Sequence, residues 1–447
     1  MNPYNQNTKT ALLQGHLRPI KDIKFSEKSA LIYTASNDRL VISWNTNTGE
    51  KIRTYTHSAA VNFIRITNDG KYLISGDSTG CVYIWDTKGG VLLKKIEKDP
   101  TYCVRSIDIS TDDFFLMIVY AGRAKGAKSF FEIYKLNELL NLYAENRSKE
   151  ESNKRIGNIP QEYLIDKRKQ KIEKEIESSI YSLKDYKSSQ ESVEIQPFMT
   201  IECKAADTKY YQARFIIQNK SIIASREDGT VELINFSNGK IITENKFHND
   251  IITDIDVDRT DSLLLTASVD GYACVININT FQVIQKFHPI NPTRRINACK
   301  FATIKQTTTT NESENVNYSK IDVNSLFDIN TASQAQKRET VSIGVDNFFN
   351  LSNNLVQSNS IPAKKEKLVA IITGGQDSKL VTTTNQKEGG FEIIIYCALE
   401  GTELTNFESH FGPVNTLAVY DNILASGAED ATVRLHKLDQ YLSKEKE

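Results

Sequence analysis

A segment of about 41 residues recurs along this chain, and it constrains the fold more than any other feature. The first copy runs from His16 to Trp44 and contains three apolar runs of strand length separated by turn residues. This pattern predicts three consecutive antiparallel β-strands. The two tryptophans, Trp44 and Trp85, lie 41 residues apart at equivalent strand positions. Repeats of this period are typical of a β-propeller, in which four-stranded blades stack into a ring.

The repeat can be followed along the chain and predicts seven blades within residues 10–438, an all-β fold. The blades are expected to begin near His16, His57, Val104, Ala206, His248, Arg295 and His410. We expect Ala11–Leu13 to supply the outer strand of the last blade, because an open ring would leave a strand edge unpaired. Residues 439–447 form a polar C-terminal tail.

Two segments interrupt the repeat. Residues 145–195, after blade three, are rich in charge and carry apolar residues at helical spacing, which predicts a partly helical insertion. Residues 303–363, within blade six, are dominated by Thr, Asn and Ser, and we expect a largely disordered loop.

Histidine and aspartate recur at fixed spacing within the blades. His16 precedes Asp38 by 22 residues, and a Ser or Thr stands four residues before each such Asp. The predicted network consists of His16, Thr34, Asp38 and Trp44 in blade one, His248, Thr266 and Asp270 in blade five, and His410, Ser426 and Asp430 in blade seven. A buried carboxylate needs hydrogen-bond donors, so we interpret these residues as a structural network that ties strands together. A catalytic dyad is the alternative, but catalytic sites do not recur once per blade.

Other blades depart from this pattern. In blade two, Thr79 takes the place of the Asp, while Asp228 and Asp377 hold that place in blades four and six without a clear His partner.

Composition and motifs point away from catalysis and from membranes. The 55 basic and 56 acidic residues give a net charge of −1, and the six cysteines include no close pair and no zinc-ligand spacing. We therefore expect no metal and no cofactor. The N-terminus lacks the apolar core of a signal peptide, and no apolar run could span a bilayer, so a cytoplasmic protein is expected.

The segment Gly122–Ser129 superficially resembles a phosphate loop, but its glycine and lysine spacing does not match. We interpret it as a hairpin turn, with a minor RNA contact through Arg123, Lys125 and Lys128 as the alternative.

Several stretches near the C-terminus are more specific than the repeat itself. They are Gly374-Gly375-Gln376-Asp377, Val381-Thr382-Thr383-Thr384, Gly390-Phe391-Glu392, His410–Asn415 and Ser426–Asp430, together with Leu12–His16 at the N-terminus. In these stretches the chain closely resembles the subunit i family of eukaryotic translation initiation factor 3, whose members are seven-bladed WD-repeat proteins.

The resemblance implies a non-catalytic scaffold subunit. It would bind segments of subunits b and g and support mRNA recruitment and scanning on the small ribosomal subunit, with weak or absent direct RNA contact. Blades five and six are expected to form the main groove. The partner contacts we predict are Asp254, Asp256, Arg294, Arg295 and Gln376.

Three alternatives stay open at this point. The chain could be a WD-repeat adaptor of another assembly, such as a ubiquitin-ligase substrate receptor or a chromatin subunit. It could house chemistry in the central channel of the ring, or add direct RNA binding to the scaffold role.

Overall fold

The computed structural model describes residues 10–140, 196–205, 208–288, 295–305, 366–375 and 391–442. The chain divides into two compact units, one made of Met1–Ile304 and Lys367–Glu447 and the other of Lys305–Glu366. The description below concerns the first unit. The helix predicted within 145–195 and most of the loop predicted at 303–363 lie outside the described residues.

Seven four-stranded antiparallel sheets form this unit, as the repeat predicts. Blade one contains β2 (Ile20–Phe25), β3 (Leu31–Ser36), β4 (Leu40–Asn45) and β5 (Lys51–Thr56), and blade two contains β6 (Val61–Ile66), β7 (Tyr72–Asp77), β8 (Val82–Asp86) and β9 (Leu92–Ile96). Blade three contains β10 (Tyr102–Ile109), β11 (Phe115–Gly122), β12 (Ser129–Lys135) and β13 (Met199–Glu202), and blade four contains β14 (Tyr210–Ile216), β15 (Ser221–Arg226), β16 (Thr230–Asn235) and β17 (Ile241–Lys246).

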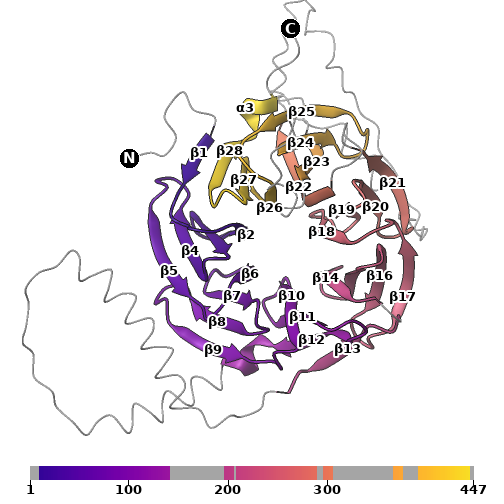
Figure 1. Cartoon of the computed structure of the whole chain (residues 1–447). Helices are drawn as coiled ribbons and strands as arrows, with labels where there is room; N and C mark the ends of the chain where they lie inside the picture. The colour runs from indigo at the N-terminus through magenta and orange to yellow at the C-terminus, as the bar shows by residue number, and fades with distance from the viewer. Residues whose placement is uncertain are drawn as a thin grey trace, which may run out of the picture. The chain divides into compact units, whose positions relative to one another are not determined.

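The remaining strands complete the ring. Blade five contains β18 (Ile252–Val257), β19 (Leu263–Ser268), β20 (Ala273–Asn277) and β21 (Gln282–Phe287), and blade six contains β22 (Arg295–Lys305), β23 (Glu366–Gly375), β24 (Glu392–Cys397) and β25 (Glu403–Glu408). Blade seven contains β26 (Val414–Tyr420), β27 (Ile423–Ala428), β28 (Val433–Lys437) and β1 (Thr10–Leu13), followed by the short helix α3 (Asp439–Leu442). In Figure 1 the first strand of each blade lies beside a central opening and the last strand lies on the outside.

The N-terminal strand closes the ring, as expected. β1 pairs antiparallel with β28, from Thr10 opposite His436 to Leu13 opposite Val433. Ala11 and Leu13 are buried while Leu12 is exposed, which is the alternation of an outer strand with one face on the core. The seven-bladed WD-repeat propeller predicted from the sequence is confirmed.

Two boundaries differ from the predictions. The outer strand of blade three, β13, follows the undescribed segment 141–195 and pairs with β12, so that segment separates the third and fourth strands of one blade. β22 continues through Lys305, so the first residues of the predicted 303–363 loop are strand. A four-residue strand with the sequence Met-Thr-Ile-Glu is too short for periodicity to detect.

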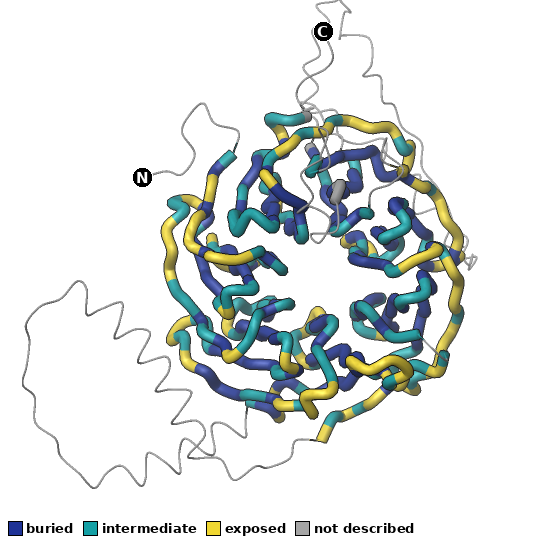
Figure 2. The backbone as a smooth tube through the Cα atoms, viewed as in Figure 1, coloured by how far each residue is buried: buried dark blue, intermediate teal, exposed yellow. Residues whose placement is uncertain are grey.

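The core lies between neighbouring blades. One cluster joins Ile74 and Ile84 of blade two to Val104 and Ile107 of blade three. Gly76 permits this packing, because a Cβ there would lie 2.8 Å from Ile107 Cδ1. Figure 2 shows the middle strands of the blades largely buried and most of the outer edge of the ring exposed, with β9 as a mostly buried exception. Each blade therefore depends on its neighbours to cover its faces.

Candidate functional site

The predicted blade network is assembled in blade one. His16 Nδ1 lies 2.8 Å from Asp38 Oδ2, and His16 Nε2 lies 2.8 Å from Thr34 Oγ1. Trp44 Nε1 donates to the same Thr34 hydroxyl at 2.9 Å. Because a carboxylate only accepts, Nδ1 carries the proton that His16 donates to Asp38. The four side chains form one chain of hydrogen bonds that joins β3, β4, the turn between these two strands and the loop before β2.

Blades five and seven repeat this geometry. His248 Nδ1 lies 3.1 Å from Asp270 Oδ2, and His248 Nε2 lies 2.8 Å from Thr266 Oγ1. In blade seven, His410 makes the same contacts with Asp430 at 3.0 Å and with Ser426 at 2.8 Å. The structure brings together every residue of the predicted network.

The carboxylates of this network are held in the charged form. Burial alone would raise the pKa of Asp270, but hydrogen bonds from His248 and from the Asn249 backbone lower it to about 2. The pKa of Asp430 is lowered in the same way by His410 and Thr432, against the effect of burial. Such carboxylates are permanent acceptors at neutral pH, which suits a structural role and not proton transfer.

Blade two keeps the histidine but not the carboxylate. His57 Nε2 lies 2.7 Å from Ser75 Oγ, to which Trp85 Nε1 also donates, while Nδ1 lies 3.2 Å from the Tyr55 carbonyl. Burial lowers the pKa of His57 to about 4, so it is a neutral imidazole at physiological pH. Thr79, which holds the Asp position, donates to Asp77.

Sequence reasoning missed two variants of the network. In blade seven, His436 Nε2 lies 3.0 Å from Ser426 Oγ and replaces the tryptophan of blade one. The ten-residue spacing from Thr34 to Trp44, applied to Ser426, is the signal that could have found it. In blade four, Arg226 binds both Asp228 at 3.1 Å and Glu232 at 2.7 Å, which supplies the partner that Asp228 lacked.

Polar side chains on the innermost strands tie each blade to the next, a feature the repeat pattern did not predict. Asp22 Oδ2 accepts from the backbone of Ile64 at 3.0 Å, and Asp108 Oδ2 accepts from Phe215 at 2.9 Å. Gln212 Oε1 likewise accepts from Ile255 at 3.1 Å. Each bond crosses to the inner strand of another blade, so these side chains stabilise the ring itself.

Two of the predicted partner contacts belong to this set of inter-blade bonds. Asp254 accepts from the backbone of Cys299 and from Lys300, and Asp256 accepts from Phe301. Their side chains are only 13 % and 16 % exposed. Arg295 is half-buried and lines the channel, while 294 and 376 lie outside the described residues. A role of these five residues in partner binding stays a prediction.

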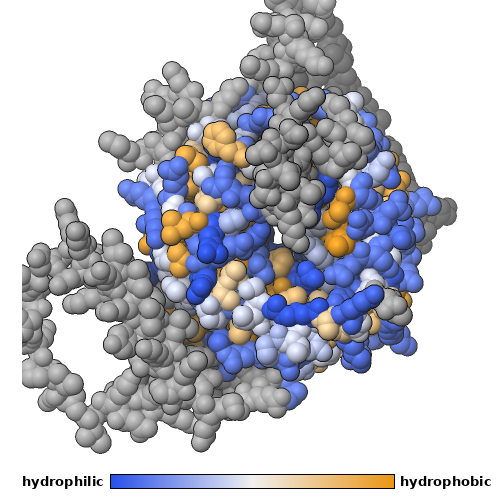
Figure 3. All heavy atoms as spheres, in the orientation of Figure 1, coloured by the Kyte–Doolittle hydropathy of each residue, from blue (hydrophilic) through white to orange (hydrophobic). Residues whose placement is uncertain are grey.

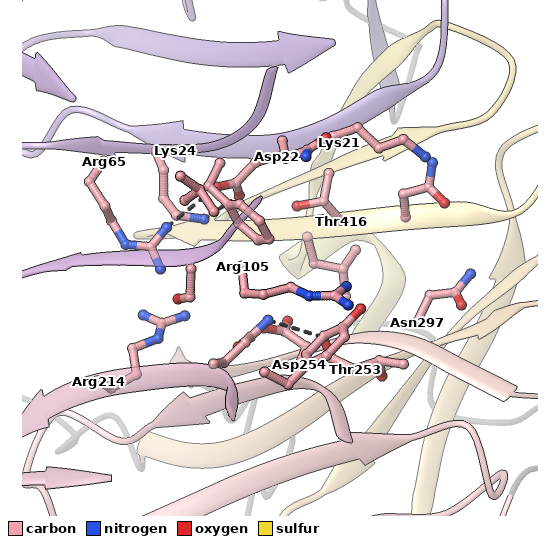
Figure 4. A pocket seen from close by; sticks show the side chains of 18 of the residues that line it. Lys21, Asp22, Lys24, Arg65, Arg105, Arg214, Thr253, Asp254, Asn297 and Thr416 are labelled. Atoms are coloured by element: carbon pink, nitrogen blue, oxygen red, sulfur yellow. Dashed lines mark hydrogen bonds and ion pairs between the residues drawn. The ribbon is translucent and has the colours of Figure 1, made fainter. Parts of the chain in front are cut away.

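The channel holds a cavity of about 300 Å³ that is lined by the innermost strands of all seven blades. Figure 4 shows its charged side chains, with Lys24 and Arg65 beside Asp22 on one side and Arg214 and Asp254 on the other. Four cations and four carboxylates gather around this part of the channel. Ion pairs join Lys24, Arg65 and Lys300 to Asp22, Asp108, Asp254 and Asp256, whereas Arg214 lies in the field of these carboxylates without an ion pair among the described residues.

Burial and the neighbouring charges both shift the pKa values of these groups. Burial lowers the pKa of Lys24 to about 8, Asp22 opposes that shift, and Arg65 adds to it. Burial raises the pKa of the Asp254 carboxyl, but the charges of Lys300 and Arg214 outweigh this effect and hold the pKa below its usual range. We interpret these charges as reciprocal partners that hold the ring closed.

An apolar strip lies on the outer strands of blades five and six. Its members are Val283, Ile284, Leu399 and Leu404, which are 36–55 % exposed. Gly401, with φ of 75°, brings the turn between β24 and β25 against β21, because a Cβ at this glycine would lie 1.6 Å from Gln285 Nε2. The two blades therefore meet at this turn, and we call these four residues the blade five–six strip. Elsewhere, the face seen in Figure 3 is mainly hydrophilic between scattered apolar patches.

The segment Gly122–Ser129 is the turn of the β11–β12 hairpin, as interpreted from the sequence. Arg123 donates to the carbonyls of Pro100, at 3.1 Å, and Ser78, and Lys128 pairs with Glu202 at 3.1 Å. Two of the three basic side chains considered for RNA are thus used within the ring, and an RNA contact there stays a hypothesis.

No group of three or more His, Cys, Asp or Glu residues in the described ranges could hold a metal ion. No helix among those residues is long and apolar enough to cross a membrane. The six cysteines are free.

Geometry and family comparison together define the class of protein. A family model described as WD domain, G-beta repeat, matches residues 7–45, 49–86, 239–277 and 401–437. With seven four-stranded blades and the His–Ser/Thr–Asp network, the chain is a WD-repeat β-propeller.

Similarity to individual curated proteins gives a narrower comparison than the WD-repeat class. The chain is 25 % identical to eukaryotic translation initiation factor 3 subunit I of Kluyveromyces lactis, over 96 % of this chain and 92 % of the relative. It is 24 % identical to the protein of the same name from Neurospora crassa, over 96 % and 91 %, and 22 % identical to that of Schizosaccharomyces pombe, over 96 % of each. The resemblance stated from the sequence is confirmed.

Proposed function

We propose that the chain is a non-catalytic scaffold subunit of eukaryotic translation initiation factor 3 in the cytoplasm. In this role it binds segments of subunits b and g and supports mRNA recruitment and scanning on the small ribosomal subunit. The observation that carries the proposal is the extent of the similarity: proteins named subunit I match 96 % of this chain, from the first blade to the last.

A scaffold role agrees with the chemistry of the ring. In blades one, five and seven the recurring histidines and aspartates are bonded to one another, and acidic side chains of the innermost strands bind neighbouring blades. These groups have fixed partners and are not poised for a substrate. What the ring offers instead is rigid outer surface, on which an extended segment of a partner can fold.

The blade five–six strip is the surface we assign to the segment of subunit b. Val283 and Ile284 of β21 and Leu399 and Leu404 beside β25 expose apolar surface that an amphipathic helix could cover. The strip crosses the seam between two blades, so one helix can contact both. This placement agrees with the expectation that blades five and six form the main groove.

The proposal is tested first by tagged purification at moderate salt, with co-purifying proteins identified by mass spectrometry. We expect the other subunits of initiation factor 3, with b and g the most abundant. Recovery of ubiquitin-ligase or chromatin components without them would overturn the proposal and favour another WD-repeat assembly.

The strip is tested by the double variant Ile284→Asp with Leu404→Asp. Two carboxylates in an apolar interface should reduce recovery of subunit b at least about tenfold, because unpaired charges are costly to bury. Ile52→Asp on the outer strand β5 of blade one is the matched control, since Ile52 is also exposed. Equal recovery of subunit b by the double variant and the control would show that the segment docks elsewhere.

A further inference from the structure

The channel has two chemically different ends, and one of them carries cationic side chains without full partners. Bulges in the innermost strands mark this end. They fall between Ile20 and Asp22, between Val61 and Phe63, between Val104 and Ser106, between Tyr210 and Gln212, between Ile252 and Asp254, and between Val414 and Thr416. The bulged residues are therefore equivalent from blade to blade. They are Lys21, Asn62, Arg105, Tyr211, Thr253 and Asn415, and all of them line the cavity. A bulge re-aims its side chain, here into the channel.

Arg295 lies at the same end. Thr253, the bulged residue of blade five, donates to the carbonyl of Ile296 at 2.6 Å, which places the start of β22 beside this layer. We call Lys21, Asn62, Arg105, Tyr211 and Arg295 the strand-start layer. It adjoins the four cations and four carboxylates described above, since Lys21 directly precedes Asp22 and both groups of residues line the same cavity.

The positive charge of the strand-start layer is only partly compensated. Lys21 pairs with Glu429 at 3.1 Å, and Arg105 Nη2 pairs with Glu227 at 3.1 Å. Within the described part of the chain, Arg295 makes no ion pair and no hydrogen bond, and its Nε is buried without a partner. Arg105 Nε is also buried without a partner. Both arginine side chains are otherwise partly exposed, but a buried N–H without an acceptor is unfavourable, and a bound anion would supply that acceptor.

We propose that the strand-start layer is a binding site for a small molecule bearing phosphate, held between Arg105 and Arg295. The planar guanidinium donates two parallel hydrogen bonds to phosphate oxygens, which an ammonium cannot do. Arg105 comes from blade three and Arg295 from blade six, so the two arginines approach the cavity from opposite parts of the ring. Figure 4 shows Arg105 extending between the strands that line this cavity.

The surroundings of the two arginines fit such a ligand. The Arg105 guanidinium lies 5.3 Å from the centre of the Tyr211 ring, which orients it across the channel. Asn62 lines the same cavity and adds a neutral side-chain amide. A cavity of about 300 Å³ admits a compact phosphate compound but not a nucleic-acid duplex. The site is independent of the outer strip assigned to subunit b.

The test uses the full chain and inorganic pyrophosphate as the probe, titrated by isothermal calorimetry at low ionic strength. We expect saturable binding by the unaltered chain and at least a tenfold loss of affinity in Arg295→Met. Arg295→Lys keeps the positive charge but loses the planar guanidinium. Its affinity for pyrophosphate should therefore lie between those of the unaltered chain and Arg295→Met. Arg18→Met is the control: Arg18 is exposed and outside the cavity lining, so pyrophosphate affinity should not change.

Two results would overturn the proposal: no binding by the unaltered chain, or equal affinity in Arg295→Met and Arg18→Met. Citrate is titrated in parallel, and binding of citrate as tight as pyrophosphate would overturn the assignment to phosphate. The melting temperature of each variant without ligand shows that it is folded, and removal of the unpaired Arg295 charge should not lower it. None of these outcomes depends on recovery of initiation factor subunits, so the two proposals fail or stand separately.

Discussion

At the scale of single residues, the same hydrogen-bond chain is built from different side chains. In blades one and two a tryptophan donates to a Thr or Ser hydroxyl, at 2.9 Å from Trp44 and 3.0 Å from Trp85. In blade seven His436 contacts that hydroxyl instead. Blade five has Ile276 at this position, and its His248, Thr266 and Asp270 are bonded as in blade one, so the polar ring adds to the network but is not required by it.

The first prediction concerns the carboxylate of this chain. Asp270→Ala should lower the free energy of unfolding by about 2 kcal/mol, because His248 and two backbone N–H groups lose a charged acceptor. Chemical denaturation measures this change. Glu408→Ala, on the exposed strand β25, is the control and should have almost no effect. An unchanged stability of Asp270→Ala would contradict the structural role of the His248–Asp270 pair.

Residue spacing predicted these contacts because each is local to one blade. The distance of 22 residues from His16 to Asp38 is set by β2, β3 and the turns that follow them, so it recurs in blade five and shortens only to 20 residues in blade seven. Asp254 was predicted as an exposed partner contact instead, and it binds Lys300 of the following blade. A contact between blades depends on how the ring closes, which no spacing within one repeat contains.

At the scale of elements, strands β1 and β13 show what pattern can and cannot detect. β1 was predicted because a closed ring needs an outer strand in its last blade, and the burial of Ala11 and Leu13 on either side of the exposed Leu12 agrees with that prediction. β13 lies beyond a long segment outside the described residues, and its four residues carry no periodic signal. The need to close the ring predicted β1, whereas the sequence pattern alone did not reveal β13.

Deleting residues 2–13 tests the closing strand. It would uncover Val433 and Leu435, which pack with Ala11 and Leu13, and it would leave the edge of β28 unpaired. Losing two buried apolar side chains and this ladder should cost several kcal/mol and promote association through the free edge. Melting temperature and size-exclusion chromatography measure both effects. Deletion of residues 2–9 is the matched control, and the same behaviour in both deletions would contradict the closing role of β1.

At the scale of the whole ring, buried titratable groups make stability depend on pH in one direction. Burial lowers the pKa of His57 to about 4 and, with His410 and Arg434, that of His436 to about 3. The unfolded chain takes up these protons first as the pH falls below about 6.5. The folded ring is therefore destabilised between about pH 6.5 and 4, on the order of 3 kcal/mol for His57 at full titration.

The aspartates extend the same trend to lower pH. Asp270, whose folded pKa is about 2, contributes stability that is complete above its unfolded value near 4 and is lost as the pH falls towards 2. We expect the denaturant midpoint of the unaltered chain to fall steadily from pH 7 to pH 4. His436→Trp, which restores the residue of blades one and two, should reduce this slope. A midpoint independent of pH over this range would contradict the buried neutral histidines.

The joint between β1 and β28 also bears on how the protein is made. Thr10 and His436 are 426 residues apart, yet they pair side by side. At about 5–20 residues per second of synthesis, Thr10 leaves the ribosome roughly 20–90 s before its partner exists. Earlier blades can form during that time, but the seam stays open until the last strand emerges. An mRNA truncated before the codon for Val433 therefore yields a nascent protein that cannot close its ring. The pairing of β1 with β28 forms only when translation has reached the final blade.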